Sequence, residues 1–274
     1  MTELRTLIAG LAYGESPRWH DGRLWFCHWT VGEVVVMAPD GSSEVVLTVP
    51  ATTLPFCIDW LPDGRLLLVC GPEGRVLRRE SDGSLAAHAD LRRLATGPWN
   101  EIVTDDRGRA YVNGGRFEDG LVALVGPDGS VEPVADGLAF ANGMALTTDG
   151  STLIVAESHG GRLTAFDVGP DGRLANRRVW ADVAPGAPDG ICLDAEGAVW
   201  YADVPNRRCV RVREGGEVLA TVQADRGCFA CALGGRDGRT LYVTAAEWRG
   251  MEAMFDGRRT GVVLAAPAPA RASA

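Results

Sequence analysis

The hydrophobic positions of this chain form short runs that recur at nearly constant spacing. Each run follows a turn that ends in glycine and contains mostly apolar or β-branched residues, as in "DGRLWFCH", "DGRLLLVC", "RGRAYVN", "DGSTLIVAES", "EGAVWYAD" and "DGRTLYVTA". The six turn glycines lie 41 to 47 residues apart and are Gly22, Gly64, Gly108, Gly150, Gly197 and Gly238. Short apolar runs between turn residues are typical of strands that are buried on both faces.

A second turn lies between successive runs, in "PDGSSEVV", "SDGSLAAH", "PDGSVEPV", "PDGRLANRR" and "EGGEVLAT". Asp-Gly and Gly-Gly provide the positive φ that tight hairpins require. Each unit of about 43 residues therefore contains two hairpins, or four strands, and no segment has helical periodicity. The sequence predicts an all-β fold: a six-bladed β-propeller with four strands in each blade.

The two ends of the chain predict how the ring of blades closes. The sixth unit runs through "TLYVTAAEW" and "TGVVLAAPAPARASA" and ends without a second hairpin, so its blade lacks an outer strand. Residues 3–8 precede the first unit, and we expect them to supply that strand in the blade that contains residues 241–244. We expect one propeller domain over residues 1–274, with a disordered Ala- and Pro-rich tail over about residues 266–274.

One position in each unit, seven or eight residues before the turn glycine, is polar in four units and cysteine in two. In chain order these residues are Glu15, Cys57, Asn100, Asn142, Asp189 and Cys231. Equivalent positions of all blades face the same axis, so the four side chains with oxygen atoms should meet there. The apolar neighbours of Cys57 and Cys231 indicate that these two cysteines are small packing residues.

Two carboxylates and two amides on one axis predict a metal site. Repulsion between the carboxylates requires a cation between them or a proton on one of them. No lysine is available for this, because all 27 basic residues are arginine. Carboxylate and amide oxygens without histidine favour Ca²⁺, and Zn²⁺, Mn²⁺, Mg²⁺ and Fe²⁺ are the alternatives.

Composition excludes several other functions. A formal net charge of −9 without a basic patch argues against nucleic-acid binding. The absence of lysine excludes Schiff-base enzymes, pyridoxal-phosphate enzymes and the P-loop. Seven irregularly spaced cysteines favour a reducing compartment, and we find neither a signal peptide nor an apolar stretch of membrane-spanning length. We therefore expect a cytoplasmic protein without a membrane partner.

Four segments resemble a known family. "GESPRW", "ANGMALTTDGSTLIVAES", "APDGICLDAEGAVWYAD" and "GCFACALGGRDGRTLYVT" are similar to the senescence marker protein, regucalcin and gluconolactonase family, and the resemblance extends over about residues 11–245. The resemblance implies a six-bladed propeller with a divalent metal held by Glu15, Asn142 and Asp189. It also implies that Asn100 lies close by, in contact with the substrate or with a water on the metal, and that the activity is hydrolysis of sugar lactones.

One residue departs from the pattern of that family. Its sugar-lactone members tend to have arginine two residues before the asparagine of the third blade, where this chain has Pro98. Pro98 and Trp99 would make the mouth of the site less polar, which favours a more apolar lactone. Arg116, in the loop "NGGRFEDG", and His159, which follows a buried strand, are further candidates for substrate contact.

The resulting hypothesis is a metal-dependent lactonase, that is, a hydrolase of carboxylic esters that acts on a small-molecule lactone or ester. Asp189 is expected to be both a metal ligand and the general base, with Glu15 chiefly a ligand. Two alternatives stay open. One is a hydrolase of another ester class, such as phosphotriesters, and the other is a non-catalytic calcium-binding propeller.

Overall fold

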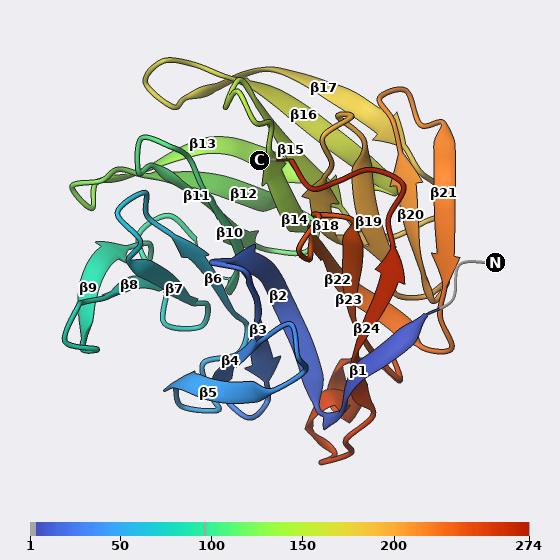
Figure 1. Cartoon of the computed structure of the whole chain (residues 1–274). Coiled ribbons are helices and arrows are strands. Elements are labelled where there is room, and N and C mark those ends of the chain that lie inside the picture. The colour runs from blue at the N-terminus through green and yellow to red at the C-terminus, as the bar shows by residue number, and fades with distance from the viewer. Residues whose placement is uncertain (1–3, 96, 274) are drawn as a thin grey trace.

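The computed structural model of the 274-residue chain describes residues 4–95 and 97–273. The 24 strands within these residues form six antiparallel sheets of four strands each, arranged around a central axis (Figure 1). The innermost strands contact one another in chain order, and the last contacts the first. This arrangement confirms the predicted six-bladed β-propeller.

The strands of each blade follow one another outward from the axis. Blade 1 contains, from the innermost strand, β2 (Tyr13–His20), β3 (Arg23–Trp29), β4 (Glu33–Met37) and β5 (Ser43–Thr48). Blade 2 contains β6 (Phe56–Trp60), β7 (Leu66–Cys70), β8 (Arg75–Arg79) and β9 (Leu85–Asp90). Blade 3 contains β10 (Trp99–Thr104), β11 (Ala110–Gly115), β12 (Gly120–Val125) and β13 (Val131–Leu138).

The second half of the ring follows the same order. Blade 4 contains β14 (Ala141–Leu146), β15 (Thr152–Glu157), β16 (Arg162–Val168) and β17 (Leu174–Asp182). Blade 5 contains β18 (Pro188–Leu193), β19 (Val199–Asp203), β20 (Arg208–Val212) and β21 (Val218–Gln223). Blade 6 contains β22 (Gly227–Gly234), β23 (Thr240–Ala246), β24 (Gly261–Pro267) and, outermost, β1 (Arg5–Leu11).

The apolar runs that predicted buried strands are the second strand of each blade. All five residues of β7 and all five of β19, for example, are buried. The glycine in the turn before each of these six strands has a φ between 66° and 83°. Because a Cβ atom makes this left-handed conformation unfavourable, glycine is the residue that lets these hairpins turn tightly.

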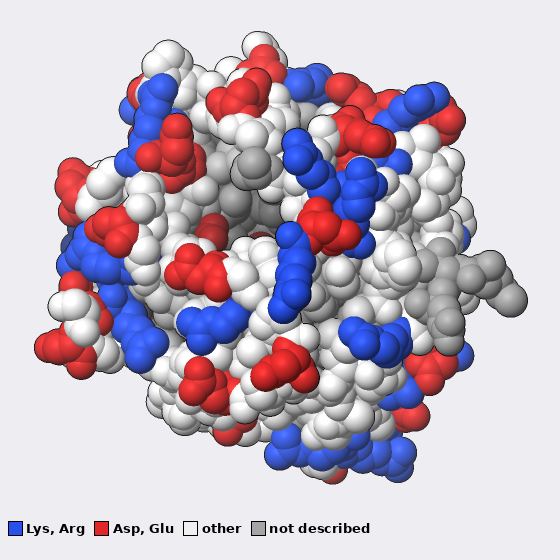
Figure 2. Space-filling view, viewed as in Figure 1, with Lys and Arg blue, Asp and Glu red and all other residues white. Residues whose placement is uncertain are grey.

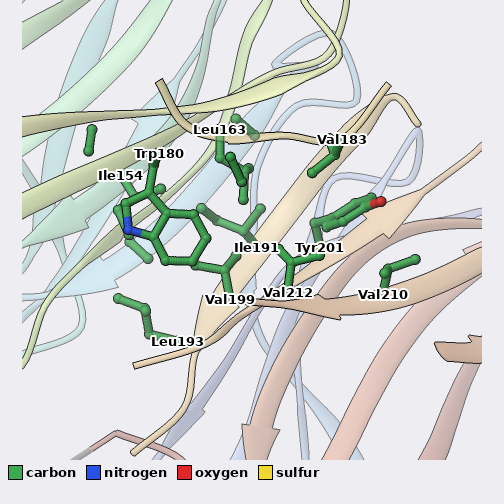
Figure 3. Close-up of a cluster of buried hydrophobic side chains, with 14 residues drawn as sticks. Ile154, Leu163, Trp180, Val183, Ile191, Leu193, Val199, Tyr201, Val210 and Val212 are labelled. Atoms are coloured by element: carbon green, nitrogen blue, oxygen red, sulfur yellow. The ribbon is translucent and has the colours of Figure 1, made fainter. Parts of the chain in front are cut away.

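Adjacent blades pack against each other through separate hydrophobic clusters, one at each of the six interfaces. Figure 3 shows the cluster between blades 4 and 5, where the indole of Trp180 lies among aliphatic side chains that include Leu193 and Val199. Each sheet therefore buries both of its faces, and removal of apolar surface from water stabilises the blades only when they stand side by side.

The N-terminal strand closes the ring, as predicted. β1 pairs antiparallel with β24, in the same sheet as β23. Glu3, which the prediction included in this strand, lies outside the described residues. Leu11 is buried at the end of β1, in the cluster that joins blades 6 and 1. The first and last parts of the chain thus share one sheet.

The prediction of a disordered tail is wrong for residues 266–273. β24 extends to Pro267, Ala272 forms a bridge with Asp194, and Ala270 is buried. The carbonyl oxygen of Arg271 accepts a hydrogen bond of 2.9 Å from the amide of Ala195. The tail is ordered because these backbone bonds join it to a turn of blade 5.

A short 3-10 helix, η1 (Met251–Phe255), lies between β23 and β24. The sequence did not indicate it, because five residues are too few to show a helical period. Within residues 4–95 and 97–273, no helix has the length and hydrophobicity needed to cross a membrane.

If β1 closes the ring by burial of its apolar residues, Leu11→Ala should lower the free energy of unfolding by about 2–4 kcal/mol, from lost burial plus a cavity. Arg5→Ala is the matched control, since Arg5 is exposed on the same strand and should cost less than about 0.5 kcal/mol. Urea unfolding followed by tryptophan fluorescence measures both. Equal effects of the two substitutions would contradict closure by the buried face of β1.

Candidate axial site

The structure brings four of the six predicted axial residues into one cavity. Glu15 from β2, Asn100 from β10, Asn142 from β14 and Asp189 from β18 line a cavity of about 450 Å³ at one end of the axis, which we call the axial cavity. The two cysteines at equivalent positions of blades 2 and 6 belong to the hydrophobic clusters between blades. The axial cavity therefore has an oxygen-rich floor made by four blades.

Irregularities in strand pairing occur at three of these four residues. Trp99 pairs with Gly114 and Glu101 with Asn113, so Asn100 is the extra residue of a β-bulge. The same kind of shift occurs at Asn142, between Ala141 and Met144, and at Asp189, between Pro188 and Ile191. A bulge turns a side chain out of the regular alternation of a strand. The inner strands thus lose some regular pairing where they place polar groups on the axis.

Hydrogen bonds fix the two amides. Asn100 Nδ2 donates to Asn142 Oδ1 over 2.9 Å, and Asn142 Nδ2 donates to Ser158 Oγ over 3.3 Å. Ser158 Oγ in turn donates to the carbonyl oxygen of Pro188 over 2.7 Å. A carbonyl oxygen has two lone pairs, so Asn142 Oδ1 retains one that can coordinate an ion.

The two carboxyl groups repel each other in a poorly solvated place. Burial raises the pKa of Glu15 well above its usual range, and the charge of Asp189 raises it further. Burial also raises the pKa of Asp189, with a further contribution from Glu101, while a hydrogen bond from Asn142 opposes this rise. Within the described part of the chain, neither Glu15 nor Asp189 forms an ion pair with arginine or histidine. A proton or a bound cation is needed to relieve the repulsion.

The sequence did not identify the groups directly beneath this floor. Arg18 Nη2 donates to Glu101 Oε1 and to the carbonyl oxygen of Ile102, both over 2.8 Å, and Ser16 Oγ donates to the same Glu101 oxygen over 3.3 Å. A second cavity at the opposite end of the axis is lined by Arg18 and Asp59, among others. The Arg18–Glu101 pair therefore lies between the two cavities.

Figure 2 shows one face of the ring, with a hollow near its centre and charges of both signs around it.

A signal for Glu101 does exist in the sequence. In "WNEIVT" two polar residues interrupt an otherwise mostly apolar strand. In a regular strand Asn100 and Glu101 would point to opposite faces, and only one could reach the axis. The bulge at Asn100 removes this restriction, and Glu101 is buried near the axis as well.

Three predicted substrate contacts have different outcomes. Arg116 and His159 both line the axial cavity and are exposed at its rim. Trp99 does not line it: its side chain is 1% exposed and packs in the cluster between blades 2 and 3. The prediction for Trp99 is therefore wrong, because the bulge after it directs Asn100 to the axis and leaves Trp99 in the core. Pro98 does line the cavity.

The donor set of the floor fits a hard cation. Among residues 4–95 and 97–273, no three His, Cys, Asp or Glu side chains form a group that could hold a metal. A metal site here would thus depend on amide oxygens together with the carboxylates of Glu15 and Asp189. Ca²⁺ accepts this mixture of ligands in flexible geometry, whereas Zn²⁺ prefers imidazole and thiolate.

Comparisons with known proteins agree on one relationship. Residues 13–247 match the family described as "SMP-30/Gluconolactonase/LRE-like region". Regucalcin of Xenopus laevis is 29% identical over 260 residues, which cover 85% of this chain and 83% of that protein. A pentonolactonase of Haloferax volcanii is 27% identical over 262 residues, which cover 90% of this chain and 86% of that protein. The structure of a calcium-binding protein, regucalcin, from Agrobacterium tumefaciens is similar with a TM-score of 0.81 and 21% identity, over 99% of this chain and 95% of that one.

The raised pKa values of Glu15 and Asp189 predict how stability depends on pH without divalent ions. Above about pH 4 the native chain keeps protons that the unfolded chain has lost, so the free energy of unfolding should fall as pH rises through the raised values. Asp189→Asn removes one charge. In EDTA at about pH 8 it should be more stable than the wild type, because the charge that opposes folding is gone, and the difference should shrink toward pH 4.

Urea unfolding in EDTA over this pH range measures the difference. Asp136→Asn, at an exposed carboxylate of β13, is the matched control and should leave the profile of the wild type unchanged. A variant Asp189→Asn that is less stable than the wild type at every pH would show that the two carboxylates do not oppose folding.

Proposed function

Because the chain belongs to the SMP-30/gluconolactonase/LRE-like family, we propose that it hydrolyses a lactone in the axial cavity. The observation that carries this proposal is the convergence of Glu15, Asn100, Asn142 and Asp189 on one cavity floor. The similarity to a pentonolactonase supports a lactone as the substrate class. The cavity volume of about 450 Å³ lies within the usual range for small-molecule sites.

Glu15, Asn142 and Asp189 would hold one divalent cation, with Ca²⁺ favoured by the oxygen donors. When bound, the ion would polarise the lactone carbonyl and stabilise the negative charge that develops on its oxygen. Its charge would also compensate the two carboxylates, for which the described residues offer no ion pair. Support for this ligand set comes from the repulsion between Glu15 and Asp189 and from the fixed amide of Asn142.

The protein groups have distinct parts in the reaction. Asp189 would accept the proton of the attacking water and return it to the alcohol oxygen released when the ring opens, since its carboxylate lies on the cavity floor where the lactone would bind. Asn100, held by its bond to Asn142, would orient the lactone above the floor. Glu15 would serve chiefly as a ligand, and the hydrogen bond of 2.9 Å that its Oε2 accepts from the Ser16 amide would hold its carboxylate in place.

We also propose a cytoplasmic location. All seven cysteines are free in the structure, and six of them are buried. A reducing compartment keeps such thiols free.

Asp189→Asn should lower kcat/KM for lactone hydrolysis by about 10²–10⁴, because it keeps the shape and one oxygen but removes the base. Asn100→Ala should raise KM more than it lowers kcat. A pH-stat assay over sugar, aliphatic and aryl lactones measures both, and Asp136→Asn is the matched control. Near-normal turnover by Asp189→Asn would place the base elsewhere.

Removal of divalent ions should abolish hydrolysis, and readdition of single ions should restore it, with Ca²⁺ expected to be effective. Binding of an ion to the native state alone should also stabilise the fold, by about 2.7 kcal/mol at a concentration 100 times Kd. Thermal unfolding with and without Ca²⁺ measures this, and the gain should be much smaller in Glu15→Gln. Full activity in EDTA would contradict metal dependence.

Two other outcomes would change the function. Hydrolysis of a phosphotriester but of no lactone would assign the site to the other ester class. Ion binding without turnover of any ester, with any divalent ion, would indicate a non-catalytic calcium-binding propeller.

A further inference from the structure

Exposed apolar side chains gather at the mouth of the axial cavity. Eight large hydrophobic side chains are exposed among residues 4–95 and 97–273, and four of them line this cavity: Phe117, Trp248, Met251 and Phe255. The other four, Val45, Val179, Val218 and Leu219, lie on the outermost strands of three blades. Single apolar residues on a surface are ordinary, whereas a contiguous set around one cavity marks a binding site.

One side of the mouth is formed by blade 6. The segment 247–260, between β23 and β24, carries Trp248, Met251 and Phe255, and we call it the roof. Met254 of the roof is buried together with Phe229 of β22 in a separate hydrophobic cluster. The rings of Phe229 and Trp248 are in edge contact, with centroids 5.8 Å apart. The apolar wall therefore continues from the core to the rim.

The other side of the mouth is formed by blades 3 and 4. The ring centroids of Phe117 and Phe140 are 4.6 Å apart, and those of Phe140 and His159 are 5.0 Å apart. Phe140 has a φ of 58°, which is unfavourable for a residue with a Cβ atom. Its carbonyl oxygen accepts a hydrogen bond of 3.0 Å from the Ser158 amide, which holds this conformation. Blade 3 lies opposite blade 6 in a ring of six, so aromatic side chains stand on both sides of the mouth.

Polar groups are few above the floor. In the described lining of the cavity, polar groups of side chains beyond the four floor residues come only from Arg116, Ser158, His159 and the indole N–H groups of Trp29 and Trp248, of which that of Trp29 already donates to the Phe56 carbonyl. Ser158 already donates to Pro188 and accepts from Asn142. A polyhydroxylated ring would bury several hydroxyl groups against this wall without partners, which is unfavourable.

We infer that the axial cavity takes a lactone with an apolar substituent, an alkyl chain or an aryl ring, which lies between the roof and the Phe117–Phe140–His159 wall. This inference rests on the proposed lactone hydrolysis and specifies its substrate class. A small molecule is the occupant, because the apolar wall and the oxygen-rich floor belong to one cavity of about 450 Å³. A single ligand of this kind can place its ester on the floor and its apolar part against the wall.

The test compares γ-lactones whose side chains run from methyl to octyl with an aldonolactone. In the wild type, kcat/KM should rise about two- to fourfold for each added CH₂ group until the cavity is filled, and the aldonolactone should be the poorest substrate. In the double variant Met251→Ser, Phe255→Ser, which we call the roof variant, the rise in kcat/KM for each added CH₂ group should be less than about 1.5-fold. Val179→Ser is the matched control, since Val179 and Met251 are both 57% exposed and Val179 lies on β17, away from the cavity.

Direct binding separates this inference from the proposed function. The probe is 2-heptyltetrahydrofuran, a cyclic ether that cannot be hydrolysed, and its binding is followed by calorimetry. If no lactone is hydrolysed but the ether binds, and binds at least about fivefold more weakly to the roof variant, the apolar site stands and the lactonase function fails.

Three results would overturn the apolar site. The first is lactone hydrolysis that does not depend on chain length. The second is preference for the aldonolactone. The third is binding of the wild type to phosphatidylcholine vesicles that the roof variant loses, without any dependence of hydrolysis on chain length, since the roof would then be a membrane-docking surface.

Discussion

The pairing of β1 with β24 is the interaction on which the rest of the molecule depends. Each blade buries its faces only against its two neighbours, so an open ring would expose the cluster that Leu11 completes between blades 6 and 1. Closure also fixes the distances across the axis. The carboxylates of Glu15 in blade 1 and Asp189 in blade 5 repel each other because the closed ring holds both of them on the floor of the axial cavity.

Closure makes the centre of the ring a place where charge is concentrated and poorly solvated. The inner strands supply carboxylates and amides to it. Arg18 compensates the charge of Glu101, which lies beneath the floor, but it forms no ion pair with Glu15 or Asp189. A folded protein tolerates such uncompensated acids where they serve a ligand or a reaction. The stability of the ring and the chemistry of its axis are thus coupled through the same side chains.

The axial cavity joins two environments that different parts of the fold supply. Its floor comes from innermost strands, whose positions the sheets fix closely. Its apolar mouth comes largely from connecting segments, such as the roof and the loop that carries Phe117. Loops vary without disturbing the blades. A propeller can therefore keep the same catalytic groups on its floor while the loop side chains at the mouth determine which substrate binds.

The sequence by itself determined the repeats, the turns and the axial register. Strand and turn periodicity arise from local backbone geometry, so the buried second strands, the positive-φ glycines and the column containing Glu15, Asn142 and Asp189 could be predicted from spacing alone. Only the tertiary structure decided that Trp99, next to the bulge at Asn100, packs in the core and that Glu101 is buried near the axis. It alone paired Arg18 with Glu101, 83 residues away in the chain, and ordered the tail against blade 5. These features depend on contacts between distant segments, which leave no periodic trace in the sequence.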